Sequence, residues 1–148
     1  MSFRFTLAPL LRLRQSIERQ CTLKLQEANL QVSRAQEKLA QLERSLAESA
    51  QSDATALQAG RTAVELQFAS VLRENLHHYR AELQSDVLKL ELVRRQALSE
   101  YRQAYREREV LETLRAGQRR AYQQEQVHRQ QQELDATYLL QRWHRRRD

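Results

Sequence analysis

Apolar residues in the first third of the chain recur at alternating intervals of three and four positions. This spacing predicts a coiled-coil helix, in which the apolar positions line up as one seam. Upstream, two successive intervals of four form a stutter, which locally relaxes a supercoil. Pro9 suits the first helical turn, because the amide hydrogen that proline lacks would be unpaired there. We therefore predict a helix over about 8–52. Its expected seam residues are Leu10, Leu13, Ile17, Cys21, Leu25, Ala28, Val32, Ala35, Leu39, Leu42 and Leu46.

A second, longer stripe predicts a second helix over about 62–142, followed by a basic tail at about 143–148. Gly117 costs roughly 1 kcal/mol relative to alanine in a helix but need not break it. Between the helices, Ser52, Asp53 and Thr55 prefer turns and helix caps, so we expect a turn at about 53–61. The expected seam residues of the second helix are Val64, Phe68, Val71 or Leu72, Leu76 or Asn75, Tyr79, Leu83, Val87, Leu90, Val93, Ala97, Tyr101, Ala104, Arg108, Leu111, Arg115, Gln118 and Tyr122.

Two long helices joined by a short connection are expected to fold back on each other. The predicted fold is all-α, with two long helices in an antiparallel coiled-coil hairpin and a single coiled-coil domain over 1–148. One alternative is a continuous helix that obtains its second strand by dimerisation. Two glycines and one proline in 148 residues exclude a fold with many turns, which supports either helical arrangement over a sheet protein.

Catalysis is not expected, because a narrow seam between helices does not wall a substrate pocket. The motifs G-x-S-x-G, H-E-x-x-H and C-x-x-C are missing, and two isolated glycines cannot form a phosphate-binding loop. His77 and His78 are adjacent and would point about 100° apart on a helix, so they are interpreted as solvated surface rather than metal ligands. We expect neither an enzyme nor a cofactor.

A single cysteine, Cys21, fits a reducing compartment. No apolar run approaches the ~20 residues of a membrane span. These features predict a cytoplasmic protein without membrane insertion.

The formal net charge of +6 is unevenly distributed, with +3 in residues 1–50, −1 in 51–100 and +4 in 101–148. In a hairpin, both basic segments would lie at the open end. Nucleic-acid binding is one interpretation. However, arginine alternates with glutamate over most of the chain, as on the solvated flank of a coiled coil, and no nucleic acid is expected as a partner. A generic scaffold coiled coil is a further alternative.

One stripe near the predicted turn has two interpretations. Phe68, Leu72, Asn75 and Tyr79 follow one another at intervals of four, three and four. They either belong to the seam or face outward, where exposed aromatic and leucine side chains favour protein partners.

Several segments together resemble FliJ-type flagellar export proteins. The chain opens with Phe3-x-Phe5-x-Leu7, continues with the helical sequence AQEKLAQLE at 35–43, and carries REVLETLR at 108–115 and QELDATY at 132–138. The resemblance covers almost the whole length, and the YscO-type injectisome proteins are the nearest alternative within the class.

The resemblance implies a non-catalytic hairpin similar to the central stalk of rotary ATPases, peripherally associated with the export apparatus of the inner membrane. It implies binding to a hexameric export ATPase (FliI-like) and to the export gate protein (FlhA-like), coupling ATP hydrolysis to secretion, and recycling of export chaperones. We expect the gate contact at Phe68, Leu72, Asn75 and Tyr79. We expect the contact with the ATPase ring at Arg12, Arg14, Arg115, Arg119 and Arg120.

Overall fold

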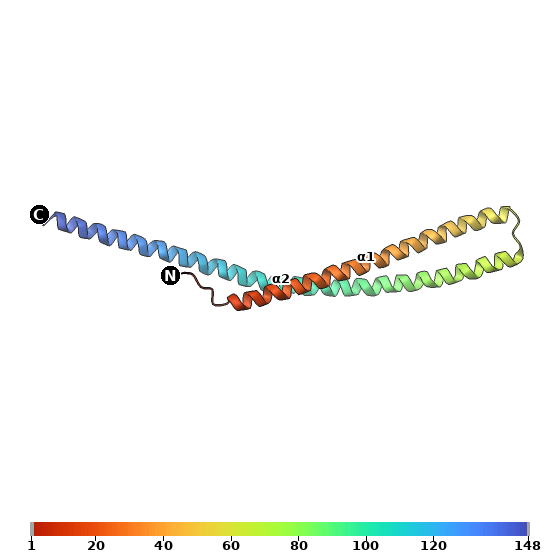
Figure 1. Cartoon of the computed structure of the whole chain (residues 1–148), viewed down its shortest axis with the longest axis horizontal. Helices are drawn as coiled ribbons and strands as arrows, with labels where there is room; N and C mark the ends of the chain where they lie inside the picture. Colours follow the sequence, from red (N-terminus) through yellow and green to blue (C-terminus); the bar gives the residue numbers. More distant parts are fainter. Residues whose placement is uncertain (1, 148) are drawn as a thin grey trace. The chain divides into compact units, whose positions relative to one another are not determined.

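A computed structural model describes residues 2–147, which form two long α-helices and no strand (Figure 1). Helix α1 spans Ala8–Gln58 and helix α2 spans Ala63–Arg145. Contacts divide the chain into two units. We call residues 2–18 with 103–147 the terminal unit, and Arg19–Arg102 the turn unit.

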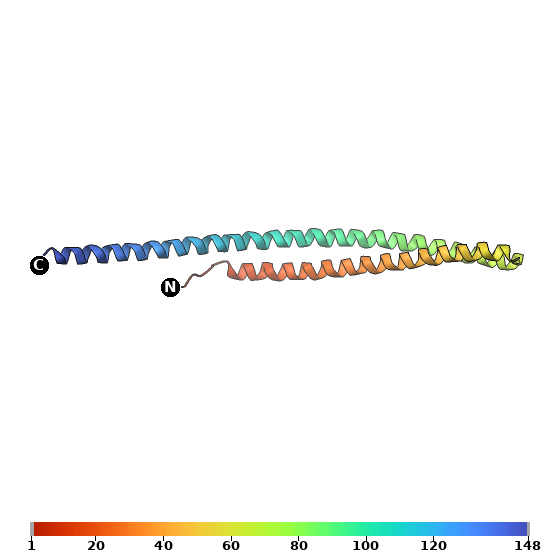
Figure 2. The same cartoon turned by 90° about the horizontal axis from the view of Figure 1, so that it is seen from above.

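The helices pair antiparallel within each unit. In the turn unit, Gln36 donates a hydrogen bond to Glu91 at 3.5 Å, and Arg80 pairs with Glu43 at 3.3 Å. In the terminal unit, Arg14 near the start of α1 pairs with Glu107 of α2. Figure 2 shows the same pairing of α1 with α2 from above. The predicted all-α helical hairpin is confirmed, and one continuous helix is not formed. A single domain over 1–148 stays a prediction.

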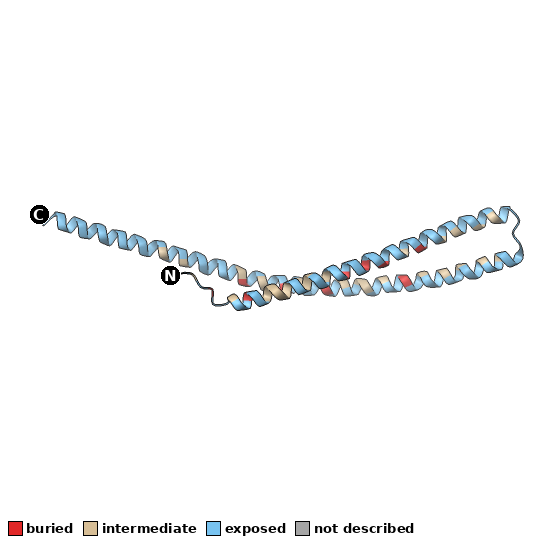
Figure 3. Ribbon diagram, viewed as in Figure 1, coloured by how far each residue is buried: buried red, intermediate tan, exposed pale blue. Residues whose placement is uncertain are grey.

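The seam of α1 follows an unbroken heptad. Every residue of the predicted stripe from Leu25 to Leu46 is buried or half-buried (Figure 3). Upstream, the prediction is wrong at Leu10 and Leu13, which are exposed, whereas Leu11 is buried. The predicted stutter is absent because polar residues occupy the regular seam positions. The seam of α1 consists of Leu11, Arg14, Glu18, Cys21, Leu25, Ala28, Val32, Ala35, Leu39, Leu42, Leu46, Ser49, Asp53 and Ala56.

The seam of α2 is equally regular, and it also includes charged residues. Near the turn it differs from the prediction, since Val64, Phe68, Val71, Leu72 and Tyr79 are exposed. Farther along, Val93 is exposed, and so are Arg115 and Gln118. The physical reason is that arginines of α2 occupy seam positions, where carboxylates of α1 pair with several of them. The seam of α2 consists of Leu66, Ala69, Arg73, Leu76, Arg80, Leu83, Val87, Leu90, Arg94, Ala97, Tyr101, Ala104, Arg108 and Leu111.

The segment before α1 contributes to the core of the terminal unit. Phe5 and Leu11 are buried there against Leu111 of α2, and Phe3 packs against this cluster. The ring of Phe3 also meets that of Tyr122, with 5.8 Å between the ring centroids. The apolar residues that precede α1 therefore cover a part of α2 that lies beyond the N-terminal end of α1.

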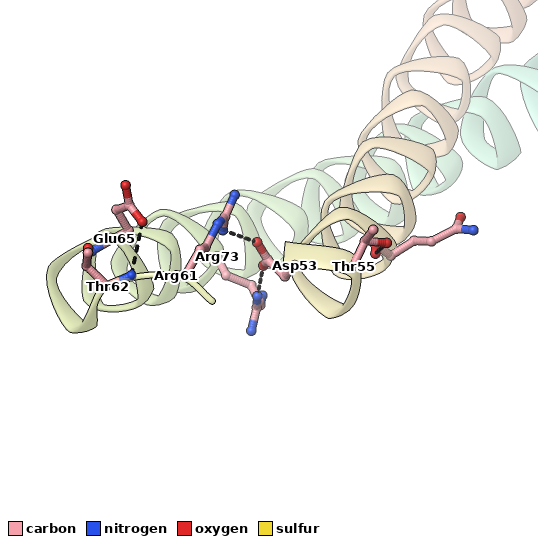
Figure 4. A network of polar contacts seen from close by, with 7 residues as sticks. Asp53, Thr55, Arg61, Thr62, Glu65 and Arg73 are labelled. Carbon is pink, nitrogen blue, oxygen red and sulfur yellow. Dashed lines mark hydrogen bonds and ion pairs between the residues drawn. The ribbon is translucent and has the colours of Figure 1, made fainter. Parts of the chain in front are cut away.

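The connection between the helices is shorter than the sequence predicts, because α1 continues to Gln58 rather than ending near residue 52. Thr55 donates its hydroxyl hydrogen bond to the carbonyl of Gln51 at 2.9 Å, which lets it remain inside the helix. Asp53 accepts hydrogen bonds from Arg61, at 2.9 Å, and from Arg73 (Figure 4).

Gly60 reverses the chain with a φ of 83°, a left-handed conformation that favours glycine. Helix α2 then starts with a reciprocal cap. The Thr62 amide donates to Glu65 at 3.1 Å, and the Glu65 amide donates to the Thr62 hydroxyl at 3.4 Å (Figure 4). At the other end, α2 continues to Arg145, so part of the expected tail is helical, and Asp148 lies outside the described residues.

Candidate interaction surfaces

The arginines expected at an ATPase ring all belong to the terminal unit, but they are not equivalent. Arg12, Arg115, Arg119 and Arg120 are exposed, and none makes an ion pair with a described residue. Arg14 occupies a seam position, is only 35% exposed and pairs with Glu107. Arg14 therefore holds α1 against α2, whereas the other four present free positive charge.

Arg108 forms a second cross-helix cluster in the terminal unit. Its side chain is 16% exposed and pairs with Glu18 of α1 and, at 2.7 Å, with Glu112 of α2. Burial lowers the pKa of Arg108, but hydrogen bonds to Glu112 and Glu18 and their negative charges raise it above its ordinary value overall. The guanidinium also lies 5.0 Å from the centroid of the Tyr105 ring. This cluster joins the helices and leaves Arg108 little capacity for an external partner.

The residues expected at the export gate lie on one outward face of α2 in the turn unit. Phe68 is 72% exposed, and Leu72, Asn75 and Tyr79 are exposed as well. Each of these four residues immediately precedes a seam residue, which rotates it by about 100° out of the helix pair. The structure thus selects the outward interpretation of this stripe over the seam interpretation.

A groove adjoins this face, and residues of both helices line it. Asp53 and Ser49 of α1 line one side, and Val64, Phe68 and Leu72 of α2 line the other, around a volume of about 600 Å³. The Asp53 carboxylate pairs with both Arg61 and Arg73, so the groove combines apolar side chains with an ion-paired polar side. Such a surface suits a protein partner that contributes apolar side chains.

Two apolar surfaces were not predicted from the sequence. In the turn unit, Leu23 of α1 and Leu92 and Val93 of α2 flank a groove of about 810 Å³. Near the end of α2, Leu139, Leu140 and Trp143 are all more than half exposed. The first surface had no signal in the sequence, because the apolar spacing places Val93 in the seam rather than on an exposed face. The second carried a detectable signal in the sequence, namely apolar residues at helical spacing just before and at the start of the basic tail.

Residues 2–147 contain no group of three His, Cys, Asp or Glu side chains that could hold a metal ion. His77 and His78 are exposed, and Cys21 is half-buried at the seam. Neither described helix has a stretch apolar enough, at sufficient length, to cross a bilayer. What these surfaces offer is contact with other macromolecules.

Comparison with known proteins gives one result. The family model of the flagellar FliJ protein matches residues 3–148, which is nearly the whole chain. No curated protein and no solved structure matches the chain at a significant level.

Proposed function

Because this chain belongs to the FliJ family and is thereby a component of flagellar type III export, we propose that it is the non-catalytic subunit linking the export ATPase to the export gate. It would use a different unit of the hairpin for each partner. The observation that carries the proposal is that free positive charge is concentrated in the terminal unit, and an outward apolar stripe lies in the turn unit.

The terminal unit is proposed to bind a hexameric export ATPase of the FliI type. Arg115, Arg119 and Arg120 lie within two turns of α2, just beyond the buried Leu111, and Arg12 lies on α1. Their charge is unpaired, so an acidic surface could bind it without first breaking an ion pair. Arg14 contributes indirectly, because its pairing with Glu107 keeps the helices together.

The turn unit is proposed to bind an export gate protein of the FlhA type through Phe68, Leu72, Asn75 and Tyr79. Large exposed apolar and aromatic side chains are costly to leave in water, and they are the residue types that dominate protein interfaces. The adjoining groove at Asp53 and Val64 provides room for side chains of the partner.

The resemblance supports three finer features of the same proposal. The protein would couple ATP hydrolysis to secretion, take part in recycling export chaperones, and work at the cytoplasmic side of the inner membrane in peripheral association with the export apparatus.

The test separates the two partners by paired variants. R119E/R120E is expected to lose stimulation of the purified export ATPase while retaining binding to the gate protein. F68A/Y79A is expected to lose gate binding while retaining ATPase stimulation. R95E/R102E provides the matched charge reversal, and L23A/L30A provides the matched loss of exposed apolar residues.

All variants should retain the helical circular dichroism of the unmodified chain, because every altered side chain is exposed. The proposal is wrong if each partner-directed pair affects both partners equally, or neither. A chain that forms stable homodimers and leaves the ATPase unaffected would instead be a scaffold.

A further inference from the structure

The last turns of α2 differ in chemistry from the rest of the chain. Residues 136–147 read ATYLLQRWHRRR, with four arginines and no acidic residue. Just upstream, by contrast, the basic Arg129 forms an i,i+4 ion pair with the acidic Glu125. We call residues 136–147 the C-terminal segment. Within the segment itself no acidic side chain offsets this charge, and the acidic residues Asp135 and Asp148 stand on either side of it in the sequence.

The apolar residues of the C-terminal segment gather on one side of the helix. Ala136, Leu139, Leu140 and Trp143 follow at intervals of three, one and three, which places them within an arc of about 100°. By the same geometry, Arg145 and Tyr138 lie on the opposite side, and Arg142 lies between them and the apolar arc. The segment is therefore amphipathic, with an apolar face and a basic face.

Nothing in the described chain covers this apolar face. Every residue from Val127 to Arg147 is exposed, and Leu139, Leu140 and Trp143 are 62%, 60% and 56% exposed. The guanidinium of Arg147 lies 4.4 Å from the centroid of the Trp143 ring, so the basic end and the aromatic side chain are presented together. An external partner must match both an apolar and a strongly cationic surface.

We propose that the C-terminal segment binds the surface of a membrane rich in anionic phospholipid. Leu139, Leu140 and Trp143 enter the interface between headgroups and acyl chains, and the arginines contact the headgroup phosphates. Short amphipathic helices with tryptophan and leucine on one face and arginine on the other bind membranes in this way. Each arginine near such a surface strengthens binding roughly fivefold. A nucleic acid would satisfy the arginines but would leave the two leucines in water.

This inference is independent of the proposed function, since it uses none of the residues assigned to the ATPase or to the gate. If the C-terminal segment does not bind lipid, the assignments of Arg119 and Phe68 are unaffected. Binding would hold the end of α2 at a membrane surface.

Trp143 is the only tryptophan of the chain, so its fluorescence reports on this segment alone. The full chain is titrated with vesicles of phosphatidylglycerol and phosphatidylcholine, and in parallel with vesicles of phosphatidylcholine only. We expect a blue shift of the Trp143 emission with the anionic vesicles, which weakens as salt is added. Brominated phosphatidylcholine in the anionic vesicles is expected to quench the emission, because the ring enters the acyl region.

Three variants divide the apolar from the electrostatic contribution. L139S/L140S is expected to weaken binding to anionic vesicles by roughly tenfold or more. R142Q/R145Q/R146Q/R147Q is expected to weaken it by at least about a hundredfold. The matched control is V127S/L134S, which removes two equally exposed apolar residues of α2 outside the C-terminal segment and is expected to bind as the unmodified chain does.

Three results would overturn the proposal. Equal binding to neutral and anionic vesicles would contradict the role of the arginines. Unchanged vesicle binding by L139S/L140S would reduce the interaction to charge attraction without insertion. An equal fluorescence change on adding a single-stranded oligonucleotide, with no vesicles present, would identify the segment as a nucleic-acid site instead.

Discussion

Leu11 and Leu13 are two positions apart on α1, yet their environments are opposite. Leu11 is 3% exposed and packs with Phe5 and Leu111, whereas Leu13 is 55% exposed. Leu11→Ala is expected to lower the free energy of unfolding by about 2–4 kcal/mol, because it removes buried methyl groups and leaves a cavity.

Urea unfolding followed by circular dichroism measures this difference. Leu13→Ala is the control, and its expected effect is below about 0.5 kcal/mol, since it alters an exposed surface. Equal losses for the two variants would contradict the assigned seam of α1.

Arg108 is a charged residue at a seam position of α2. Arg108→Gln is expected to lower the free energy of unfolding by about 1–3 kcal/mol, because Glu18 and Glu112 lose a charged hydrogen-bond donor. The folded-state pKa of Arg108 is raised, so its contribution is complete below the unfolded-state pKa and is lost only as the pH rises through the folded-state value.

Arginine keeps its proton well above pH 10, and the pKa of Arg108 is raised further, so the destabilisation by Arg108→Gln should be the same at pH 7 and at pH 10. Chemical denaturation of both proteins at the two pH values tests this. A loss that shrinks markedly by pH 10 would show that the guanidinium is not the stabilising group.

At the scale of the elements, the two glycines are expected to respond in opposite directions to the same substitution. A Cβ atom at Gly60 or at Gly117 would meet nothing within 4 Å, so sterics do not distinguish them. Gly60 has a φ of 83° in the turn, whereas Gly117 lies inside α2. Gly60→Ala should destabilise by about 1 kcal/mol, and Gly117→Ala should stabilise by up to about 1 kcal/mol.

Thermal unfolding of the two variants side by side provides the measurement, with each serving as the other's control. A stabilising Gly60→Ala would mean that the turn does not require the left-handed conformation. A destabilising Gly117→Ala would mean that α2 is not continuous through residue 117.

At the scale of the whole molecule, the seam residues of α1 find their packing and ion-pair partners on α2 of the same chain. Asp53 meets Arg73, Glu18 meets Arg108, and apolar positions such as Val32 and Leu83 are buried without a second copy. We therefore expect a monomer at micromolar concentration in light scattering, with an unfolding midpoint independent of protein concentration.

A mass of two chains would contradict this expectation. In that case L23S/L92S, which alters the exposed groove of the turn unit, would test whether this groove forms the contact. A dimer that persists in that variant would indicate a different interface.

The candidate surfaces were partly predictable. The four arginines Arg12, Arg115, Arg119 and Arg120 could be found from charge alone, because charged residues are exposed unless a partner holds them. Arg14 is held in this way by Glu107, which is 93 positions away in the chain. No local pattern reveals a pairing of that separation.

The sequence by itself determined the two helices, the region of the turn and the seam from Leu25 to Leu46. These follow from composition and from a period of 3.5 residues, both of which are local properties. Only the tertiary structure decided the phase of α2 between residues 64 and 80. The spacing of apolar residues alone favoured Phe68 and Tyr79 as seam residues. In the structure, Arg73 and Arg80 occupy the seam positions of this region instead. Asp53 and Glu43 of α1 lie opposite these arginines, and this pairing across the hairpin turns the aromatic stripe outward.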